Sequence, residues 1–153
     1  QSGLAKWSTI PYSYLAMTKP SPYSESNARE ELLVSERKYA FIYPMEKKRE
    51  WYALDAEERM RIMRGHIETG RRYPQITINT AYSFGIDDQE FVVSFECDDP
   101  GDFLDLVQEL RGTESSAWTL RDTPIFSCVA MSVGHALDAL DGAATSRSAP
   151  ALA

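Results

Sequence analysis

Apolar side chains recur at helical spacing between Asp55 and Gly70, and this pattern predicts an amphipathic helix. Asp55 suits the N-cap, with Glu58 three residues later as in a capping box. Gly70 suits the position just after the helix. The expected inner face is a single stripe: Ile62, Met63, His66 and Ile67. The opposite face is charged: Glu57, Arg61, Arg64 and Glu68. The helix therefore carries one histidine on its apolar side.

A second helix is predicted between Asp99 and Gly112. Asp99 is a suitable cap, Pro100 fits the first helical position because no free N–H is needed there, and Gly112 ends the pattern. The inner stripe of this helix has the spacing of a face that packs on a core: Phe103, Leu106, Val107 and Leu110.

Five shorter segments are rich in apolar and β-favouring residues and each predicts a strand: 13–18, 38–43, 75–84, 90–97 and 124–131. Pro20 and Pro44 should end the first two, because proline cannot donate a ladder hydrogen bond. The turn Gly85-Ile86-Asp87-Asp88 should join the third and fourth as a hairpin.

From residue 38 the expected order is strand, helix, strand, strand, helix, strand. This order is typical of the split βαβ, ferredoxin-like arrangement, an α+β fold with both helices on one face of an antiparallel sheet. We expect this unit to span residues 38–131. Residues 1–37 look like the end of a preceding similar unit plus a connecting loop. Residues 132–153, rich in Ala and Ser from Asp141 on, are predicted to form a flexible tail.

The charge limits the classes of partner. The chain has 23 acidic and 16 basic residues, a net charge of −7. Nucleic acids and anionic membranes attract basic patches, so neither is an expected partner. The short basic run Lys47-Lys48-Arg49 has two interpretations, a solvated loop or a binding site for carboxylates.

Cys97 and Cys128 lie in apolar runs without metal-type spacing, which indicates reduced thiols in a cytoplasmic or organelle interior. No apolar run reaches the length of about 18 residues that a transmembrane helix needs. The first residue is Gln, so we expect a processed chain or part of a longer product.

His66 also has two interpretations. A lone histidine on an apolar helix face is most often a hydrogen-bonded core residue. The alternative is a haem ligand, because the apolar residues beside it form a patch that a flat porphyrin could cover. An acidic residue beyond the second helix, such as Glu114, could then orient the imidazole and raise its basicity. His135 is expected to face solvent.

Tyr43 ends a predicted strand at the sheet edge that faces the first helix. It is either a core tyrosine whose hydroxyl reaches water or a redox-active phenol beside a haem. Lys47 could hold a carboxylate or relay a proton. Arg29 is either a guanidinium fork for a carboxylate or a surface arginine.

Other chemistries lack their motifs. The chain has no glycine-rich phosphate loop and no zinc-type cluster of His and Cys. Ser116 and His135 lack a partner set for a hydrolase triad.

Six short motifs extend over about residues 8–131: Ser13-Tyr14-Leu15, Lys19-Pro20-Ser21-Pro22-Tyr23, Tyr43-Pro44-Met45-x-Lys47-Lys48, Trp51-Tyr52, Gly65-His66 and Gly85-Ile86-Asp87-Asp88. Together they resemble the chlorite dismutase superfamily and, within it, the coproheme decarboxylases. The resemblance implies a dimeric α+β barrel subunit with two ferredoxin-like units, the second of which holds haem. This chain has the second unit and only the end of the first. The resemblance also implies a homo-oligomer or a second chain that supplies the missing half.

The resemblance further implies roles for individual residues. His66 matches the proximal iron ligand, and Glu114 matches the acid that accepts a hydrogen bond from it. Tyr43 matches the tyrosine that becomes a radical in the decarboxylases, where chlorite dismutases have an aliphatic residue. Lys47 matches the lysine beside the reacting propionate.

The remaining site residues that the resemblance implies are Arg29 and Ser116 at propionate-binding positions and Trp51 among the cofactor-binding residues. Ile78 falls at the distal position, where chlorite dismutases need an arginine. Ile78 cannot hydrogen-bond an oxyanion, which makes chlorite chemistry an unfavourable interpretation.

The leading hypothesis is therefore the hydrogen-peroxide-dependent decarboxylation of coproheme III to haem b, with iron porphyrin as cofactor and substrate and with a radical on Tyr43. Two alternatives stay open. One is a haem-free structural subunit that reuses the fold inside a larger assembly. The other is a chlorite dismutase or haem peroxidase.

Overall fold

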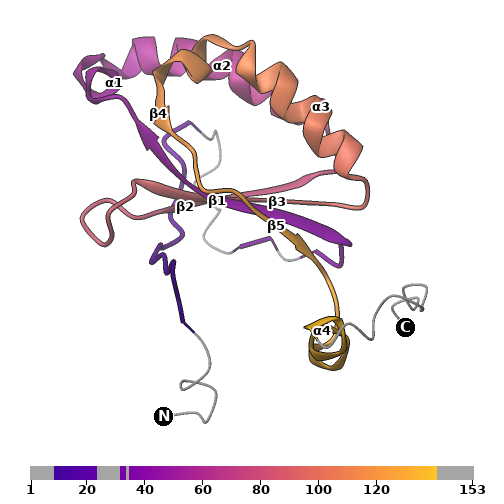
Figure 1. Ribbon diagram of the computed structural model, residues 1–153. Helices are drawn as coiled ribbons and strands as arrows, with labels where there is room; N and C mark the ends of the chain where they lie inside the picture. Colours follow the sequence, from indigo (N-terminus) through magenta and orange to yellow (C-terminus); the bar gives the residue numbers. More distant parts are fainter. Residues whose placement is uncertain (1–8, 24–31, 34, 141–153) are drawn as a thin grey trace.

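The structure is a computed structural model that describes residues 9–23, 32–33 and 35–140 (Figure 1). Its strands are β1 (Tyr39–Lys47), β2 (Thr77–Tyr82), β3 (Phe91–Cys97), β4 (Thr119–Arg121) and β5 (Phe126–Val129). Its helices are α1 (Arg49–Ala53), α2 (Ala56–Arg71), α3 (Pro100–Arg111), the short 3₁₀ helix η2 (Glu114–Trp118) and α4 (Val133–Leu140).

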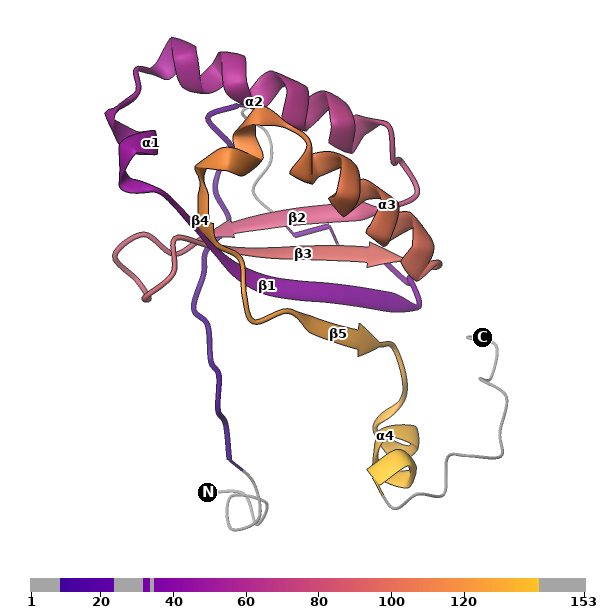
Figure 2. The same ribbon diagram turned by 45° about the horizontal axis from the view of Figure 1, so that its top comes forward.

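The described strands form one antiparallel sheet in the order β2-β3-β1-β4, with β5 also paired to β1. Figures 1 and 2 show α2 and α3 side by side across one face of this sheet. The predicted α+β, ferredoxin-like fold is therefore confirmed. β1 lies in the middle of the sheet, so its residues reach both the helices and the opposite face.

The two long helices begin where the sequence predicted. The Asp55 side chain accepts a hydrogen bond from the backbone N–H of Glu58 at 2.8 Å, and the Asp99 side chain accepts one from Gly101 at 2.8 Å. The predicted end of the first helix was wrong. α2 runs through Gly70 to Arg71, because Gly70 keeps helical geometry and no left-handed turn forms there.

Pro44 does not end its strand, contrary to the prediction, because β1 continues to Lys47. β1 pairs with β3 along this stretch, and Pro44 lies opposite Val92. On its other side, β1 pairs with β5 only up to Ile42 and with β4 only from Glu46. Pro44 thus lies in the interval where β1 has no partner on that side, so no ladder hydrogen bond is lost there.

The core lies between the sheet and α3. Leu106 and Cys97 are fully buried, and the rings of Phe41 and Phe103 stack with centroids 3.9 Å apart and planes 5° apart. Phe95 adds a tilted contact to Phe103 at 5.3 Å. Alternate residues of β1 and β3 therefore face the helices, as expected for strands with a period of two.

Two terminal segments differ from the prediction. Residues 13–18 form no strand; Met17 makes one isolated bridge to Tyr82, because only that residue pairs in antiparallel register with the edge of β2. At the other end, α4 replaces the first part of the predicted flexible tail, and its apolar residues keep helical spacing. Residues 141–153 lie outside the described residues. In the part of the chain that is described, no helix has the length and apolar character needed to cross a bilayer.

Candidate functional site

Lys47 lies at the end of β1 with its side chain under the helices, and only 7% of the residue is exposed. Its Nζ donates hydrogen bonds to the carbonyl oxygen and the hydroxyl of Ser115 at 3.1 and 3.2 Å. It also lies over the Trp51 ring, 5.1 Å from the centroid. The neighbouring Lys48 and Arg49 are exposed. Of the three cations in the basic run, only Lys47 is therefore buried.

The Lys47 ammonium has no carboxylate partner among the described residues. Burial lowers its pKa to about 8, and the nearby charge of Glu90 opposes that shift. The Glu90 carboxylate itself accepts hydrogen bonds from the Lys47 backbone N–H at 2.8 Å and from the Tyr52 hydroxyl at 2.6 Å. The ammonium is therefore mostly charged at neutral pH and still lacks a counter-ion, so an anionic ligand group would be stabilised there.

His66 lies on the inner stripe of α2, as the sequence predicted, next to buried Ile62. Its Nδ1 is buried and has no hydrogen-bond partner among the described residues. Burial, with a smaller effect of the Lys47 charge, lowers the pKa of the imidazole to about 4. The side chain is thus a neutral imidazole at pH 7, which is the form that binds iron. A buried polar atom without a partner costs roughly 1–3 kcal/mol, so the hydrogen-bonded core interpretation does not describe this histidine.

Ser115 connects the lysine to the turn of α2 that precedes the histidine. It is almost fully buried, and its hydroxyl donates to Sδ of Met63 at 3.2 Å. Met63 is three residues before His66, so the two side chains are neighbours on the helix surface. Ser115 was not among the predicted site residues, although it lies in the same short helix between Glu114 and Ser116, which were.

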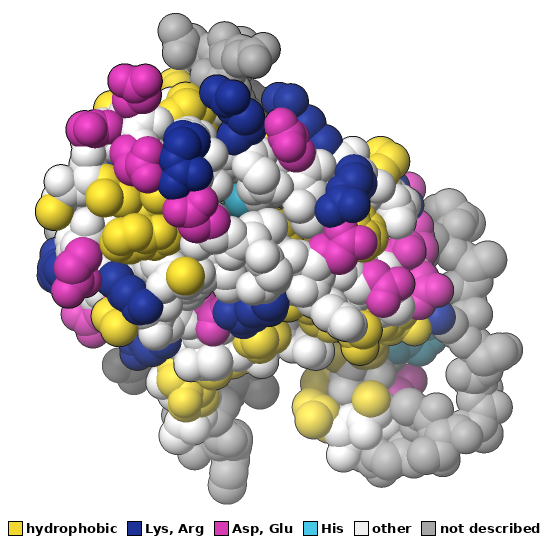
Figure 3. All heavy atoms as spheres, turned by 90° about the horizontal axis from the view of Figure 1, so that it is seen from above, with side chains coloured by type: hydrophobic (Ala, Val, Ile, Leu, Met, Phe, Trp, Pro, Cys, Tyr) yellow, Lys and Arg dark blue, Asp and Glu magenta, His cyan; other side chains and the backbone are white. Residues whose placement is uncertain are grey.

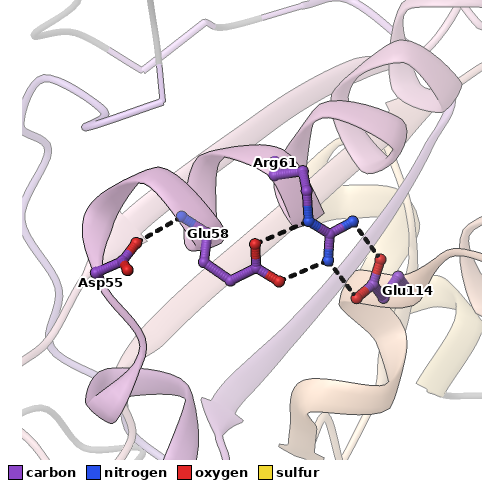
Figure 4. A network of polar contacts seen from close by, with 4 residues as sticks. All are labelled: Asp55, Glu58, Arg61 and Glu114. Carbon is purple, nitrogen blue, oxygen red and sulfur yellow. Dashed lines mark hydrogen bonds and ion pairs between the residues drawn. The ribbon is translucent and has the colours of Figure 1, made fainter.

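Glu114 does not accept a hydrogen bond from His66, which corrects the sequence-based expectation. Its carboxylate accepts two hydrogen bonds from the Arg61 guanidinium, at 3.0 and 2.8 Å. Arg61 also donates two to Glu58, at 2.9 and 2.7 Å (Figure 4). The hydrogen bond from Arg61 lowers the pKa of Glu114. The guanidinium fork occupies both carboxylate oxygens on the outer side of α2, which leaves the inner nitrogen of His66 unpaired.

This network lies on the exposed side of the helices. Half of the Arg61 side chain is accessible to solvent. Figure 3 views the molecule from that side, where basic and acidic side chains alternate over the helices and a histidine side chain is visible between them. The site is therefore buried on its sheet side and close to solvent on its helix side.

Tyr43 lies on the same face of β1 as Lys47, four residues before it, which is a separation of roughly 13 Å along a strand. Its ring stacks on Phe95 with centroids 5.8 Å apart. Its hydroxyl makes no hydrogen bond to a described residue. Burial, with the Asp122 charge, raises the phenol pKa to about 12. Tyr43 is thus a protonated phenol under the helices.

The other predicted site residues lie around this group. Trp51 is 3% exposed and packs between Lys47 and Trp118, whose ring centroid is 5.8 Å away. Ile78 is half-buried on β2 and packs against the core. Ser116 is half-buried and makes no side-chain hydrogen bond to a described residue. Arg29 lies outside the described residues.

The donor set suits an iron porphyrin better than a bare metal ion. Among the described residues, no group of three His, Cys, Asp or Glu side chains could hold a metal ion. A porphyrin supplies its own nitrogen ligands and needs one axial imidazole. The unpaired imidazole and the unneutralised ammonium fit a porphyrin that carries carboxylates.

Comparisons with known proteins identify the family of the chain. The family model for chlorite dismutase matches residues 1–131. The coproheme decarboxylase of Mycolicibacterium smegmatis is 30% identical over 133 residues, which are 86% of this chain and 58% of that protein. A solved structure of a heme-binding protein from Thermus thermophilus is 35% identical, with a TM-score of 0.64 over 71% of this chain and 46% of that one.

The solved structure of chlorite dismutase from Candidatus Nitrospira defluvii in complex with imidazole is 28% identical, with a TM-score of 0.64 over 70% of this chain and 46% of that one. The chain therefore spans a little more than half of the curated decarboxylase and about half of each of these two solved structures.

Proposed function

The chain belongs to the chlorite dismutase family, and from this premise we propose that it binds an iron porphyrin at His66 and takes part in the hydrogen-peroxide-dependent conversion of coproheme III to haem b. The observation that carries the proposal is the pair of buried groups without partners. His66 has an unpaired Nδ1, and the Lys47 ammonium has no carboxylate among the described residues. A porphyrin with propionate side chains supplies an iron for the first and an anion for the second.

When bound, an iron porphyrin would take up the oxidising equivalents of hydrogen peroxide and would bring its propionate side chains into the site. The reaction balances with one peroxide for each propionate. The propionate anion loses carbon dioxide and one hydrogen to become a vinyl group, and the peroxide takes up that hydrogen, the second electron and one further proton to give two waters. Of the two electrons that peroxide takes, one leaves through Tyr43 and the other leaves when the bond to the carboxyl carbon breaks.

Tyr43 acts in this proposal as a hydrogen-atom carrier. Its raised pKa of about 12 keeps the phenol protonated, so the side chain must lose a proton together with an electron. The resulting radical takes a hydrogen atom from the propionate carbon next to the ring, which restores the phenol. Lys47 holds the propionate carboxylate, and with a pKa of about 8 it can also give up or accept a proton near neutral pH.

Chlorite decomposition is the less supported alternative. Ile78 offers only hydrocarbon where an oxyanion would need a hydrogen-bond donor. Without a hydrogen-bond donor at that position, the negative charge that develops on a bound oxyanion is not stabilised. Oxygen release from chlorite by the haem-loaded protein would favour this alternative over decarboxylation.

The decarboxylation is tested with coproheme-loaded protein, hydrogen peroxide and a measurement of carbon dioxide and of the vinyl product. We expect Tyr43→Phe to bind coproheme and to lose product formation, because the phenyl ring keeps the packing on Phe95 but has no O–H. Tyr39→Phe is the matched control, a half-buried tyrosine on the same strand and the same face. Full activity of Tyr43→Phe would contradict the role of the phenol.

A partner chain is a second part of the proposal. The sheet face opposite the helices bears an apolar hollow of about 380 Å³, lined in part by Tyr12, Tyr14 and Phe126. Nearby, Leu15 and Met17 are 62% and 65% exposed. An apolar patch of this kind marks an interface. We expect a second copy of the chain, or a chain that supplies the first ferredoxin-like unit, to cover it. Light scattering that gives a monomer at micromolar concentration would contradict the self-association.

A further inference from the structure

Glu90 lies just before β3, at the point where β1 ends. One oxygen of its carboxylate, Oε2, accepts two hydrogen bonds, from the backbone N–H of Lys47 at 2.8 Å and from the Tyr52 hydroxyl at 2.6 Å. The paired residues of β1 and β3 end at Met45 and Phe91. The Glu90 side chain therefore takes the place of a strand partner for Lys47 and fixes the backbone from which the buried ammonium extends.

The hydrogen bond from Tyr52 to Glu90 also anchors α1. This helix has five residues, and its N-cap residue makes no side-chain cap hydrogen bond. Isolated helices shorter than about 12 residues are marginal in water, so α1 depends on contacts outside itself. Trp51 precedes Tyr52 in this helix, and its ring centroid lies 5.1 Å from Nζ of Lys47. Glu90 thus helps to place both the ammonium and the aromatic ring that covers it.

The Glu90 carboxylate is close to the Lys47 ammonium but does not pair with it. The Nζ atom donates its hydrogen bonds to Ser115 on η2 instead. The charge of Glu90 still raises the pKa of Lys47 against the larger, lowering effect of burial. The other titratable side chain that interacts with this charge is His66 on α2, whose pKa Lys47 lowers. Glu90 is therefore a carboxylate within electrostatic reach of a cation that it leaves unneutralised.

We propose that Glu90 is a positioning residue that fixes the Lys47 ammonium for a carboxylate of the ligand, and that the Tyr52 hydroxyl keeps Glu90 from neutralising this ammonium. With the hydroxyl in place, Oε2 is held by two donors and Nζ stays open. Without it, the Glu90 carboxylate loses a donor and turns to the ammonium, and this internal ion pair competes with the ligand. The positioning stands on the contacts of this chain; the use of the open ammonium rests on the proposed function.

The first test uses the protein without haem and measures the pKa of Lys47 by NMR of its side-chain nitrogen. Tyr52→Phe should raise this pKa by about one unit, because a carboxylate that pairs with an ammonium favours its charged form. Glu90→Gln should lower the pKa, because burial then acts without the opposing charge. A merely structural role of the two residues gives no reason for shifts in opposite directions.

Tyr73→Phe is the matched control. The Tyr73 hydroxyl also donates to a carboxylate, that of Glu109 at 2.9 Å, beyond the C-terminal end of α2. Its removal should leave the pKa of Lys47 unchanged. The double variant of Tyr52→Phe with Glu90→Gln should have the pKa of Glu90→Gln alone, because no carboxylate is left to turn toward the ammonium.

The second test is a titration with coproheme. Tyr52→Phe should bind coproheme about tenfold more weakly than the wild type, because an upward shift of one pKa unit is a tenfold preference for the internal pair. Tyr73→Phe should bind it as the wild type does. If Tyr52→Phe raises the pKa of Lys47 and coproheme affinity stays the same, the ammonium does not hold a carboxylate of the ligand, and that part of the proposed function fails.

The haem-free measurements decide the positioning inference separately. If no protein of the series binds coproheme, the proposed function fails, and the pKa values of Lys47 still test the role of Glu90. The inference is overturned if Tyr52→Phe lowers the pKa of Lys47 or leaves it unchanged. It is also overturned if Tyr52→Phe causes the same rise in the Glu90→Gln background. Tyr52→Phe alone still decides the inference if Glu90→Gln does not fold.

Discussion

The space between the sheet and the helices has two ends that differ in how their buried groups are satisfied. The apolar end consists of hydrocarbon, aromatic and thiol side chains: Phe41, Phe95, Cys97, Phe103 and Leu106. The polar end contains the buried polar residues and their neighbours: Lys47, Trp51, Met63, His66 and Ser115. The side chains of the apolar end are satisfied by packing against one another. The polar end holds an ammonium without a carboxylate and an imidazole nitrogen without a partner among the described residues.

This difference indicates that the two ends have different roles. Burying an unpaired charge or polar atom opposes folding, so selection for stability alone would fill the polar end with hydrocarbon. Both ends lie along β1, but the apolar end is covered by α3 and the polar end by α1, α2 and η2. The polar end therefore has the character of a ligand site, and the apolar end supplies the stability that holds it.

The largest effect is expected at the apolar end. Leu106→Ala should lower the free energy of unfolding by about 2–5 kcal/mol, because the side chain is fully buried and leaves a cavity. Urea unfolding measures this. Under conditions where the variant stays folded, its affinity for haem should match the wild type. An equal loss of haem affinity and stability would mean that the two ends are not separable.

Lys47→Met should change how the free energy of unfolding depends on pH. The folded pKa of Lys47, about 8, lies below the ordinary lysine value of 10.5, so between these values the unfolded chain binds more protons than the folded chain. The free energy of unfolding should therefore rise with pH above 8, by at most about 3 kcal/mol. The raised pKa of the Cys97 thiol, whose ordinary value is 9.0, and the raised pKa of Tyr43 above pH 10 act in the opposite direction. The contribution of Lys47 is therefore the difference between the wild type and Lys47→Met from pH 8 upward. Lys47→Met should lack this rise. A rise of the same size in both proteins would show that Lys47 is not its source.

A smaller effect on the free energy of unfolding should distinguish Ser115 from its neighbour Ser116. Ser115→Ala removes hydroxyl contacts to Lys47 and Met63 and should cost about 1 kcal/mol of unfolding free energy. Ser116→Ala, at a half-buried hydroxyl without a hydrogen bond to a described residue, should cost about half of that or less. Thermal unfolding of the two variants side by side gives the comparison. The reverse order would mean that Ser115 does not link the lysine to α2.

The sequence predicted the apolar end better than the polar end, for physical reasons. The caps at Asp55 and Asp99 and the apolar stripes use local rules that a single chain segment can satisfy. The predicted strand end at Pro44 was wrong. A strand tolerates proline where one of its sides has no partner strand, and which part of β1 lacks a partner is a property of the assembled sheet.

The errors at the polar end have a common origin in contacts between distant segments. Ser115 is one of two adjacent serines in the polar run 113–116, and only the packing of η2 on α2 reveals that it is buried. Arg61 and Glu114 are 53 residues apart, so no local pattern could predict that the arginine would take the carboxylate expected at His66. The identity of His66 as the histidine on the inner stripe was predictable because it depends on helical spacing alone.

The proposal that the half-buried imidazole of His66 binds the iron of a porphyrin can be tested by titrating the protein with haem. We expect a saturable Soret band in the wild type whose position and affinity change in His66→Ala, while His135→Ala, at an exposed histidine, behaves as the wild type. A His66→Ala variant that binds haem with the same affinity and the same spectrum as the wild type would contradict it.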